Sequence, residues 1–515
     1  MVTSINDPVQ AAKFLYRSTF GPKNGDVEKL LDFDGGIEGW FEDQFSRQNM
    51  HLNLARKVAE DTGEPLNESA RMSAWWQRSI TGGDQLRQRV AFALSQIFVV
   101  SNNGGPGGEG LASYYDVLVR NAFSRFDEIL KAVTLHPAMG QFLTLDGSRA
   151  HNEQNNTFPD ENYAREVMQL FSIGLWQLNI NGQPKLDNQG KPIPTYTQQD
   201  VEELSRVLTG WRKDKDADGS NSNTKSMINN PDWHDDGAKS VLGSDFVAGQ
   251  SAADDLDQAV SILYQHPNTP VFISRLLIQR LTISNPRRDY IERVARVFID
   301  DGEGVRGNMK AVIKAILLDE DLLEGRAMAD HQNFGSNPRN FGKVKEPVIA
   351  MTNFCRALNV KSNDSRRWWD FPGLQNNFGQ APLQAPSVFN FYEPDYAPKG
   401  EIANKELTAP EFNIHTMDSM RRISNAMWGL ILSHRYTAQK QWTWDRTPLE
   451  NRVDDPERYL EWINERIFFG LMSDDLHHYL ENLLIEMTAD NIGTDRRTFA
   501  TLFAIQCSPD FRCQE

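Results

Sequence analysis

The chain has 515 residues, with 70 Asp and Glu against 54 Lys and Arg, so its formal net charge is −16. Phosphate backbones and anionic lipid surfaces repel so acidic a chain, which argues against nucleic-acid binding and peripheral membrane binding. Aromatic residues make up 10 % of the chain and require burial, which excludes a disordered protein, and the length permits a large core without disulfides.

Apolar spacing typical of helices dominates the sequence from its start. Asp7 and Pro8 are suited to the N-cap and first position of a helix that ends before Gly21. Residues 86–98 place Leu, Val, Ala, Ile and Phe on one helical face. Further helices are predicted at residues 111–123, 126–135, 162–173, 198–208, 269–281, 288–299, 309–317, 348–358, 413–433, 456–468, 476–487 and 498–505.

Strand signals are sparse and concentrate in one segment. Residues 175–197 contain a turn at Asn181-Gly182 between two extended runs, which predicts a small hairpin. Strands and helices do not alternate, so a doubly wound sheet or a TIM-type barrel is not expected. We expect a mainly α protein: one large helical domain with a small β-hairpin insertion and long packed loops.

Three sub-regions are expected within this single domain of residues 1–515. They are an N-terminal helical half at 1–210 with the hairpin, an acidic loop at 211–245, and a C-terminal helical half at 246–515. A second irregular stretch, 370–408, is rich in Phe and Tyr, and we expect it to pack as a coat over the helices.

The spacing of the cysteines and the composition of the N-terminal residues indicate in which cellular compartment the protein could be found. Cys507 and Cys513 lie close enough in sequence to form a disulfide, and unlinked thiols are an equal alternative; Cys355 stands apart. The first residues have neither the basic nor the apolar region of a signal peptide, and residues 90–100 are too short an apolar run to span a bilayer. The sequence therefore indicates a soluble protein that is cytosolic or has lost its signal.

The densest polar pattern lies in residues 160–172. On a helix, Glu161 and Arg165 align one turn apart with the favoured polarity for an ion pair, and Glu166 belongs to a neighbouring polar row. One interpretation is a helix that presents a carboxylate and a guanidinium to a cleft. The alternative is an ordinary amphipathic helix with a solvated, salt-bridged face.

Two histidines are further candidates. His234 precedes two carboxylates and could act as a metal ligand or general base, or it could be a loop histidine held by an aspartate. His136 follows the helix predicted at 126–135, where a cationic ring suits the C-terminal end of the helix dipole better than it suits catalysis.

A weak calcium signal lies in the acidic loop. Asp214, Asp216 and Asp218, followed by Gly219, match the first half of an EF-hand loop. The twelfth position is Lys225 rather than a bidentate Glu, so a solvated acidic loop is the competing interpretation.

Taken in order, several segments resemble one bacterial family over nearly the whole chain. The most specific are Glu161 to Glu166 (ENYARE) and Leu208 to Trp211 (LTGW). The others are residues 11–22, 135–140, 196–198, 234–235, 239–243, 266–269, 304–307 and 385–392. The family is the one called "domain of unknown function 1800".

The resemblance implies a compartment and a partner rather than a reaction. Similar proteins often begin with an export signal and are often encoded beside a second family, "1501", that looks like sulfatases and alkaline phosphatases. Many members have a Trp-His-x-His-Phe segment where this chain has residues 93–98, and a His where it has Phe171. The resemblance thus implies a periplasmic or secreted protein, whereas the absence of a visible signal peptide leaves the cytoplasm open.

Two functions follow from these patterns. The first is a scaffold or accessory partner of an exported phosphatase- or sulfatase-like protein. The alternative is a hydrolase with Glu161 or Glu166 as base, Arg165 as anion anchor, and His136 and His234 nearby. Convergence of Glu161, Arg165, His136 and His234 on a concave pocket would favour the enzyme, and separate surfaces would argue against it.

Overall fold

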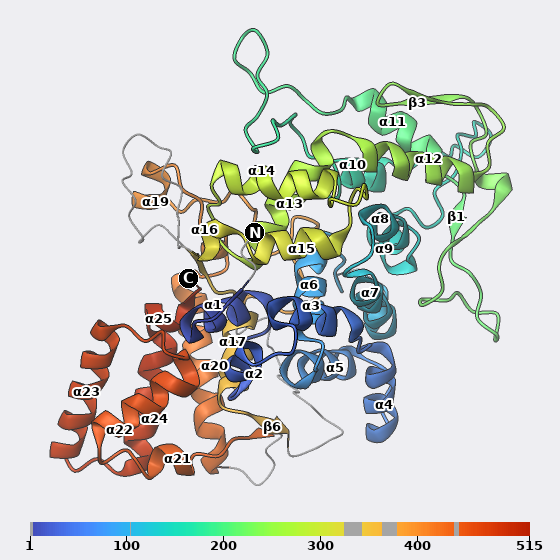
Figure 1. The fold of residues 1–515 in the computed structure, drawn as a ribbon. Coiled ribbons are helices and arrows are strands. Elements are labelled where there is room, and N and C mark those ends of the chain that lie inside the picture. The colour runs from blue at the N-terminus through green and yellow to red at the C-terminus, as the bar shows by residue number, and fades with distance from the viewer. Residues whose placement is uncertain (1–3, 104, 324–341, 363–377, 437–441, 515) are drawn as a thin grey trace.

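A computed structural model describes residues 4–103, 105–323, 342–362, 378–436 and 442–514. Helices form the body of the molecule, and the strands in this part of the chain form four two-stranded sheets (Figure 1). The predicted mainly α class with small hairpins is confirmed. None of the helices in these ranges combines the length and apolar character that crossing a membrane requires.

The first part of the chain forms a continuous series of helices. They are α1 (Pro8–Ser18), α2 (Asp26–Leu31), α3 (Gly36–Ser46), α4 (Leu52–Thr62), α5 (Glu68–Thr81), α6 (Gln85–Ser95), α7 (Gly107–Asn121), α8 (Phe126–Thr134), α9 (Pro137–Phe142), α10 (Glu161–Gln169) and α11 (Gln198–Val207).

The middle of the chain holds two short hairpins and more helices. The strands β1 (Trp211–Arg212) and β2 (Ile228–Asn229) precede η1 (Pro231–Trp233), β3 (Lys239–Val241) and β4 (Ser244–Phe246). The helices that follow are α12 (Ala252–Gln265), α13 (Asn268–Leu281), α14 (Arg288–Ile299), α15 (Met309–Leu317) and α16 (Glu320–Leu323). Residues 211–245, expected as an acidic loop, thus contain paired strands.

The last part of the chain is again helical. Its elements are β5 (Lys343–Val344), α17 (Pro347–Ala357), β6 (Lys361–Ser362), α19 (Glu401–Asn404), η3 (Pro410–Asn413), α20 (Met417–Tyr436), β7 (Trp442–Thr443), α21 (Thr447–Glu450), α22 (Pro456–Ile463), the π-helical turn η4 (Asn464–Phe468), α23 (Asp474–Ala489), α24 (Thr494–Cys507), α25 (Pro509–Arg512) and β8 (Cys513–Gln514).

Local chemistry explains where the helices begin. In α1, the Asp7 carboxylate accepts a hydrogen bond from the Gln10 amide at 2.9 Å, and Pro8 occupies the first position, as predicted. All the predicted helices are present; the bounds of 288–299 and 309–317 are as predicted, and the others have shifted ends. Several others had no prediction: α2–α5, α9, α12 and the short α16, α19, α21 and α25.

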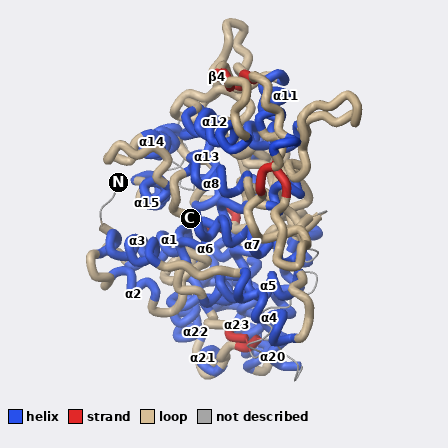
Figure 2. Tube along the Cα trace, turned by 90° about the vertical axis from the view of Figure 1, so that its right-hand side faces the viewer, coloured by secondary structure: helices blue, strands red, loops and turns tan. Residues whose placement is uncertain are grey.

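The hairpin at 175–197 is present with an added excursion. The turn forms at Gly182, whose amide donates to the Asn179 carbonyl at 2.8 Å. Beyond it, the chain makes three mutually bonded extended segments, because Gln177 donates to Ile193, Ile193 to Lys185 and Lys185 to Gln177. Figure 2 shows long loops, in tan, projecting from the end of the molecule that holds α11 and β4.

Residues 370–408 were expected to pack as a coat over the helices, and the structure describes residues 378–408 of this stretch. Residues 370–377 lie outside the described ranges. Of the aromatic residues in the rest, Phe378 and Tyr392 are buried, whereas Phe389 is 48 % exposed. The described part therefore packs down only locally.

Contacts between the chain's two ends bring the C-terminal helices against the first helix. The Tyr16 hydroxyl donates to the Ile467 carbonyl at 2.7 Å, and β5 pairs with β8 in antiparallel register, Lys343 opposite Gln514. In Figure 1 the helices α21–α25 gather at one end of the molecule, and α10–α12 with β1 and β3 lie at the other.

Candidate functional site

The polar row on α10 is a cross-link between two helices. Arg165 Nη2 lies 2.9 Å from Glu161 Oε2, which confirms the predicted pair. Gln198, the first residue of α11, donates to Glu161 Oε2 at 2.9 Å and accepts from Arg165 at 3.1 Å. The side chains of the ion pair are each 38 % exposed, so the pair is half solvated and of small energetic value.

Glu166 is buried, which the amphipathic pattern did not predict. The residue is 7 % exposed, and its Oε2 has no hydrogen-bond partner in the described part of the structure. Burial raises the pKa of its carboxyl, and the nearby Arg165 opposes that rise. The nearby Tyr196 hydroxyl donates to Gln169 at 3.3 Å. Burial raises the pKa of this hydroxyl, the charge of Arg165 lowers it, and that of Glu166 raises it.

His136 caps a helix N-terminus rather than interacting with a C-terminus. Its Nδ1 accepts a hydrogen bond from the Ala138 amide at 3.1 Å at the start of α9, and its Nε2 lies 3.2 Å from Ser113 Oγ. Burial, reinforced by the charge of Arg120, lowers the pKa of the ring to about 3. The predicted role against the α8 dipole is therefore wrong, because a neutral ring that accepts from an amide has no charge for that dipole to attract.

His234 belongs to a buried cluster with Lys239 and Asp255. Lys239 Nζ lies 2.8 Å from Asp255 Oδ2, and both side chains are fully buried. His234 Nε2 is 3.3 Å from the same oxygen, and its Nδ1 lies 3.1 Å from the Thr209 carbonyl. Asp255, in the first turn of α12, was not singled out from the sequence. The interpretation of His234 as a loop histidine held by an aspartate fits this arrangement, although Asp255 is not one of its sequence neighbours.

A second set of contacts ties the same loop to α11. Arg206 binds the Asp235 carboxylate through two nitrogens, at 2.9 and 3.1 Å, and pairs with Glu203 at 2.8 Å. The Asp235 amide donates to Thr209 Oγ1 at 2.8 Å. The motif segments 208–211 and 234–235 therefore bond directly to each other at the end of α11, and Lys239 of segment 239–243 is joined to His234 through Asp255.

The weak calcium signal has no assembled ligand set in the structure. The Lys225 amine, at the twelfth position, pairs with Asp216 at 3.4 Å, and Asp218 accepts from Ser220. Throughout the described ranges, no three His, Cys, Asp or Glu side chains gather as a metal site requires. The calcium site at Asp214, Asp216 and Asp218 stays a prediction.

The five candidate residues do not form one cluster. Glu161, Arg165 and Glu166 share α10, whereas His136 and His234 each have a different set of partners. Within the described ranges, no hydrogen bond or ion pair joins either histidine to the three α10 residues. None of the five lines the three cavities described for this chain.

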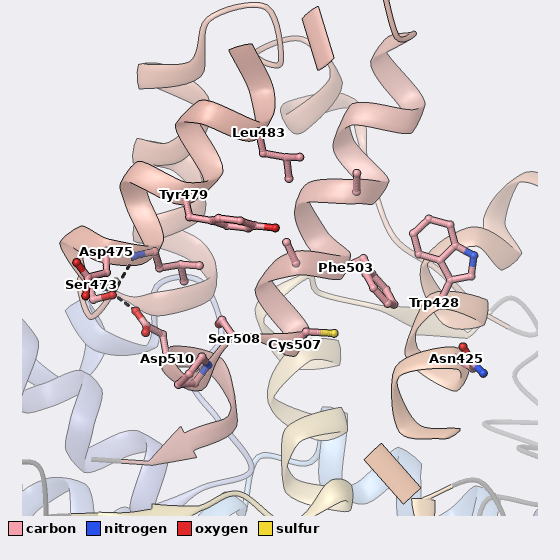
Figure 3. Close-up of a pocket in the computed structure, with 14 residues that line it drawn as sticks. Asn425, Trp428, Ser473, Asp475, Tyr479, Leu483, Phe503, Cys507, Ser508 and Asp510 are labelled. Atoms are coloured by element: carbon pink, nitrogen blue, oxygen red, sulfur yellow. Dashed lines mark hydrogen bonds between the residues drawn. The ribbon is translucent and has the colours of Figure 1, made fainter. Parts of the chain in front are cut away.

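The largest of these cavities is a groove between α20, α23 and α24, with a volume of about 1260 Å³. Figure 3 shows Tyr479 and Leu483 of α23 pointing toward α24 from one side, and Phe503 of α24 next to Trp428 of α20 on the other side. The Trp428 and Phe503 rings pack edge to face with centroids 5.1 Å apart. We call this feature the C-terminal groove.

The C-terminal groove keeps large aromatic side chains in solvent. Tyr479 is 58 % exposed and Trp428 is 36 % exposed. Asp475 and Asp510 add carboxylates to its lining, and Cys507 lies in it as a free, exposed thiol. The structure does not join Cys507 to Cys513 by a disulfide. A groove of this kind can bind an apolar segment and has no arrangement of acid, base and nucleophile.

Sequence reasoning overlooked both Asp255 and the groove. Asp255 lies on the same helical stripe as Ala259 and Leu263. An acidic residue on an otherwise apolar helix face was therefore the available sign of a buried carboxylate. For the groove, the available signal was the pair Tyr479 and Leu483, two large apolar residues one turn apart on the helix predicted at 476–487.

Comparison with known proteins identifies one family. The model of the family described as "Protein of unknown function (DUF1800)" matches residues 13–513. No curated protein and no solved structure matches the chain.

Proposed function

Since the chain belongs to the DUF1800 family over residues 13–513, we propose that it is a non-catalytic accessory protein that binds an exported phosphatase- or sulfatase-like partner through its C-terminal groove. The partner class comes from the resemblance, because similar proteins are often encoded beside such a protein. We place the protein in the periplasm or outside the cell for the same reason.

The observation that supports binding is the exposed aromatic lining of the groove. Tyr479 and Trp428 leave large apolar area in water, which is unfavourable unless another surface covers it. Trp and Tyr in such a setting are the residues that contribute most to protein interfaces. Three helices with one groove between them suit an amphipathic helix, whose apolar residues recur on one face.

The negative charge of the chain and of the groove lining indicates which kind of partner segment would bind. The chain has a net charge of −16, and Asp475 and Asp510 line the groove. A segment with Lys or Arg beside its apolar face would therefore be attracted and correctly oriented, whereas an acidic segment would be repelled. We expect the partner's binding segment to be an amphipathic helix with basic residues flanking its apolar face.

The roles of the family's polar residues also support a non-catalytic protein. The Glu161–Arg165 pair joins two helices, His136 caps a helix, and His234 lies in a buried cluster. Each group has a structural partner, and none of these residues lines a described cavity. Catalytic groups must reach substrate, which these arrangements do not favour.

The hydrolase remains the second candidate because of one observation. Glu166 is a buried carboxyl with an unbonded oxygen and a raised pKa, as general bases often are. If the protein is a hydrolase of this kind, Glu166→Gln abolishes its activity while leaving partner binding unchanged.

The test is calorimetric titration of a purified phosphatase- or sulfatase-like protein of the "1501" family into the full chain. We expect saturable binding with one partner per chain. Tyr479→Glu, which places a charge in the groove, should weaken it at least about tenfold, which is about 1.4 kcal/mol.

A matched control lies on the same helix. Ile485 is 52 % exposed on α23 but does not line the groove, so Ile485→Glu adds the same charge nearby and should leave the affinity unchanged. Absence of binding by the full chain would overturn the proposal. Equal weakening by both variants would overturn the assignment to the groove.

A further inference from the structure

A second, smaller cavity adjoins the C-terminal groove and has a different chemistry. Its volume is about 250 Å³, and it lies between α1, Lys345 and the C-terminal residues. Ser473, Pro509 and Asp510 line both cavities. We call it the Lys345 cavity.

The main chain of Lys345 is fixed on both sides. Its amide donates to the Arg512 carbonyl at 2.7 Å, and its carbonyl accepts from His415 Nε2 at 3.0 Å. The residue is only 5 % exposed, although it follows directly after β5. The position of its amine is therefore set by the fold rather than by a mobile surface loop.

The amine of Lys345 faces aromatic rings instead of a carboxylate. Its Nζ lies 4.5 Å from the centre of the Tyr16 ring and 5.1 Å from that of Phe511. Within the described ranges, no Asp or Glu forms an ion pair with it. Lys343, two residues earlier, gives the contrast, since its equally buried amine lies 2.9 Å from Glu411 Oε1.

This environment yields an amine that is partly neutral near neutral pH. Burial lowers the pKa of Lys345 to about 7, the charge of Arg512 lowers it further, and Cys513 acts in the opposite direction. The other charged groups that line the cavity are Lys13 and Asp510, and Asp510 accepts from the Ser473 amide at 2.7 Å. A neutral lysine amine is a nucleophile toward carbonyl carbon.

The remaining walls define what could reach this amine. Apolar surface comes from Tyr16, Phe468, Leu471, Pro509 and Phe511. The volume suits a small molecule and is too small for a peptide helix. A small ligand with one carbonyl group and an apolar body matches both features.

We propose that the Lys345 cavity binds a small, mainly apolar aldehyde or ketone, with which the Lys345 amine forms an imine. The nitrogen lone pair attacks the carbonyl carbon, so the C–N bond forms while the C=O π bond breaks to give a carbinolamine. The C–O bond then breaks and the oxygen leaves as water, which takes both hydrogens of the amine. No oxidant or reductant is needed, and hydrolysis reverses the step.

The experiment is reductive trapping of the full chain with benzaldehyde and sodium cyanoborohydride at pH 7, followed by peptide mass spectrometry. At this pH about half of an amine with a pKa near 7 is neutral, against roughly one in 2,500 for an ordinary lysine. We expect Lys345 to gain a benzyl group roughly 100-fold faster than surface lysines. Lys343 should stay unmodified because it is ion-paired.

Two variants make the result specific. Lys345→Arg should remove this label, with folding checked by thermal melting. Leu471→Trp, which reduces the cavity and leaves the amine in place, should slow labelling of Lys345 at least tenfold without changing the labelling of surface lysines.

Preferential labelling of surface lysines in the native chain would overturn the proposed imine. Faster trapping of glyoxylate, a small anionic aldehyde, would overturn the apolar class.

Discussion

The two ends of the molecule use their polar and apolar residues in opposite ways. Around α10–α12, polar side chains face one another, as in the Lys239–Asp255 pair and the Arg206–Asp235 pair. Around α20–α25, aromatic side chains such as Tyr479 face solvent, and the buried Lys345 faces aromatic rings rather than a carboxylate.

This difference separates residues that build the fold from surfaces free to bind. A buried ion pair whose partners lie on separate segments fixes how those segments meet, and its groups are not free for a ligand. An exposed aromatic groove contributes little to folding, because its apolar area is still in water. This contrast is the basis of our proposal that the family's polar motifs maintain the architecture and that the C-terminal groove binds a partner.

The largest expected effect is on the buried pair. Lys239→Met should lower the free energy of unfolding by about 3–5 kcal/mol, because Asp255 is left as a buried charge without its cation. Chemical denaturation measures this change. Lys225→Met, which removes a half-exposed pair with Asp216, should cost less than about 1 kcal/mol. Equal losses of unfolding free energy in the two variants would contradict the distinction between buried and half-exposed ion pairs.

The next effect is a pH dependence at His136. Its pKa of about 3 in the folded chain lies below the usual 6.5, so the unfolded chain binds the extra proton and stability falls as pH drops from 6.5 towards 3. His136→Asn keeps a capping side chain and does not titrate. Between pH 7 and pH 4 it should lose roughly 2–3 kcal/mol less stability than the wild type. An unchanged pH profile would show that the ring is not held neutral.

A smaller effect of opposite sign is expected at Glu166. Burial raises its pKa, so the folded chain retains the proton longer and stability declines as pH rises through the folded pKa. Glu166→Gln removes this decline and should raise the free energy of unfolding at pH 7 by up to about 1 kcal/mol. A loss of stability, measured by denaturation at pH 7, would instead indicate that the charged carboxylate has a stabilising partner.

The smallest effect concerns the α10–α11 cross-link. Arg165→Ala should cost about 0.5 kcal/mol, because its pair with Glu161 is 38 % exposed on each side. Thermal melting with the double variant Glu161→Ala/Arg165→Ala gives the coupling between them. A coupling above about 2 kcal/mol would mean that this pair belongs with the buried ones.

Much of the fold was predictable because helix signals are local. The cap at Asp7 and the apolar spacing of residues 288–299 need only neighbouring residues to be recognised. In α5 the pattern is obscured because Arg71 and Ser79 are buried beside Trp75 and Trp76, so polar residues interrupt the apolar stripe. Asp255 obscures the pattern of α12 in the same way.

The candidate site was less predictable because its contacts are distant in sequence. The Glu161–Arg165 pair follows from helical spacing, and it is present. Lys239 and Asp255 are brought together only by the fold. The groove likewise needs α20 beside α23 and α24, and no spacing within one helix reveals which helices will be neighbours.

The most direct test of the central claim is hydrogen exchange of the full chain with and without the phosphatase- or sulfatase-like partner. If the C-terminal groove is the binding surface, amides in α23 and α24 should exchange more slowly in the complex, and those of α10 and α11 should not change. Protection confined to α10 and α11, with exchange at the groove unaltered, would contradict the account.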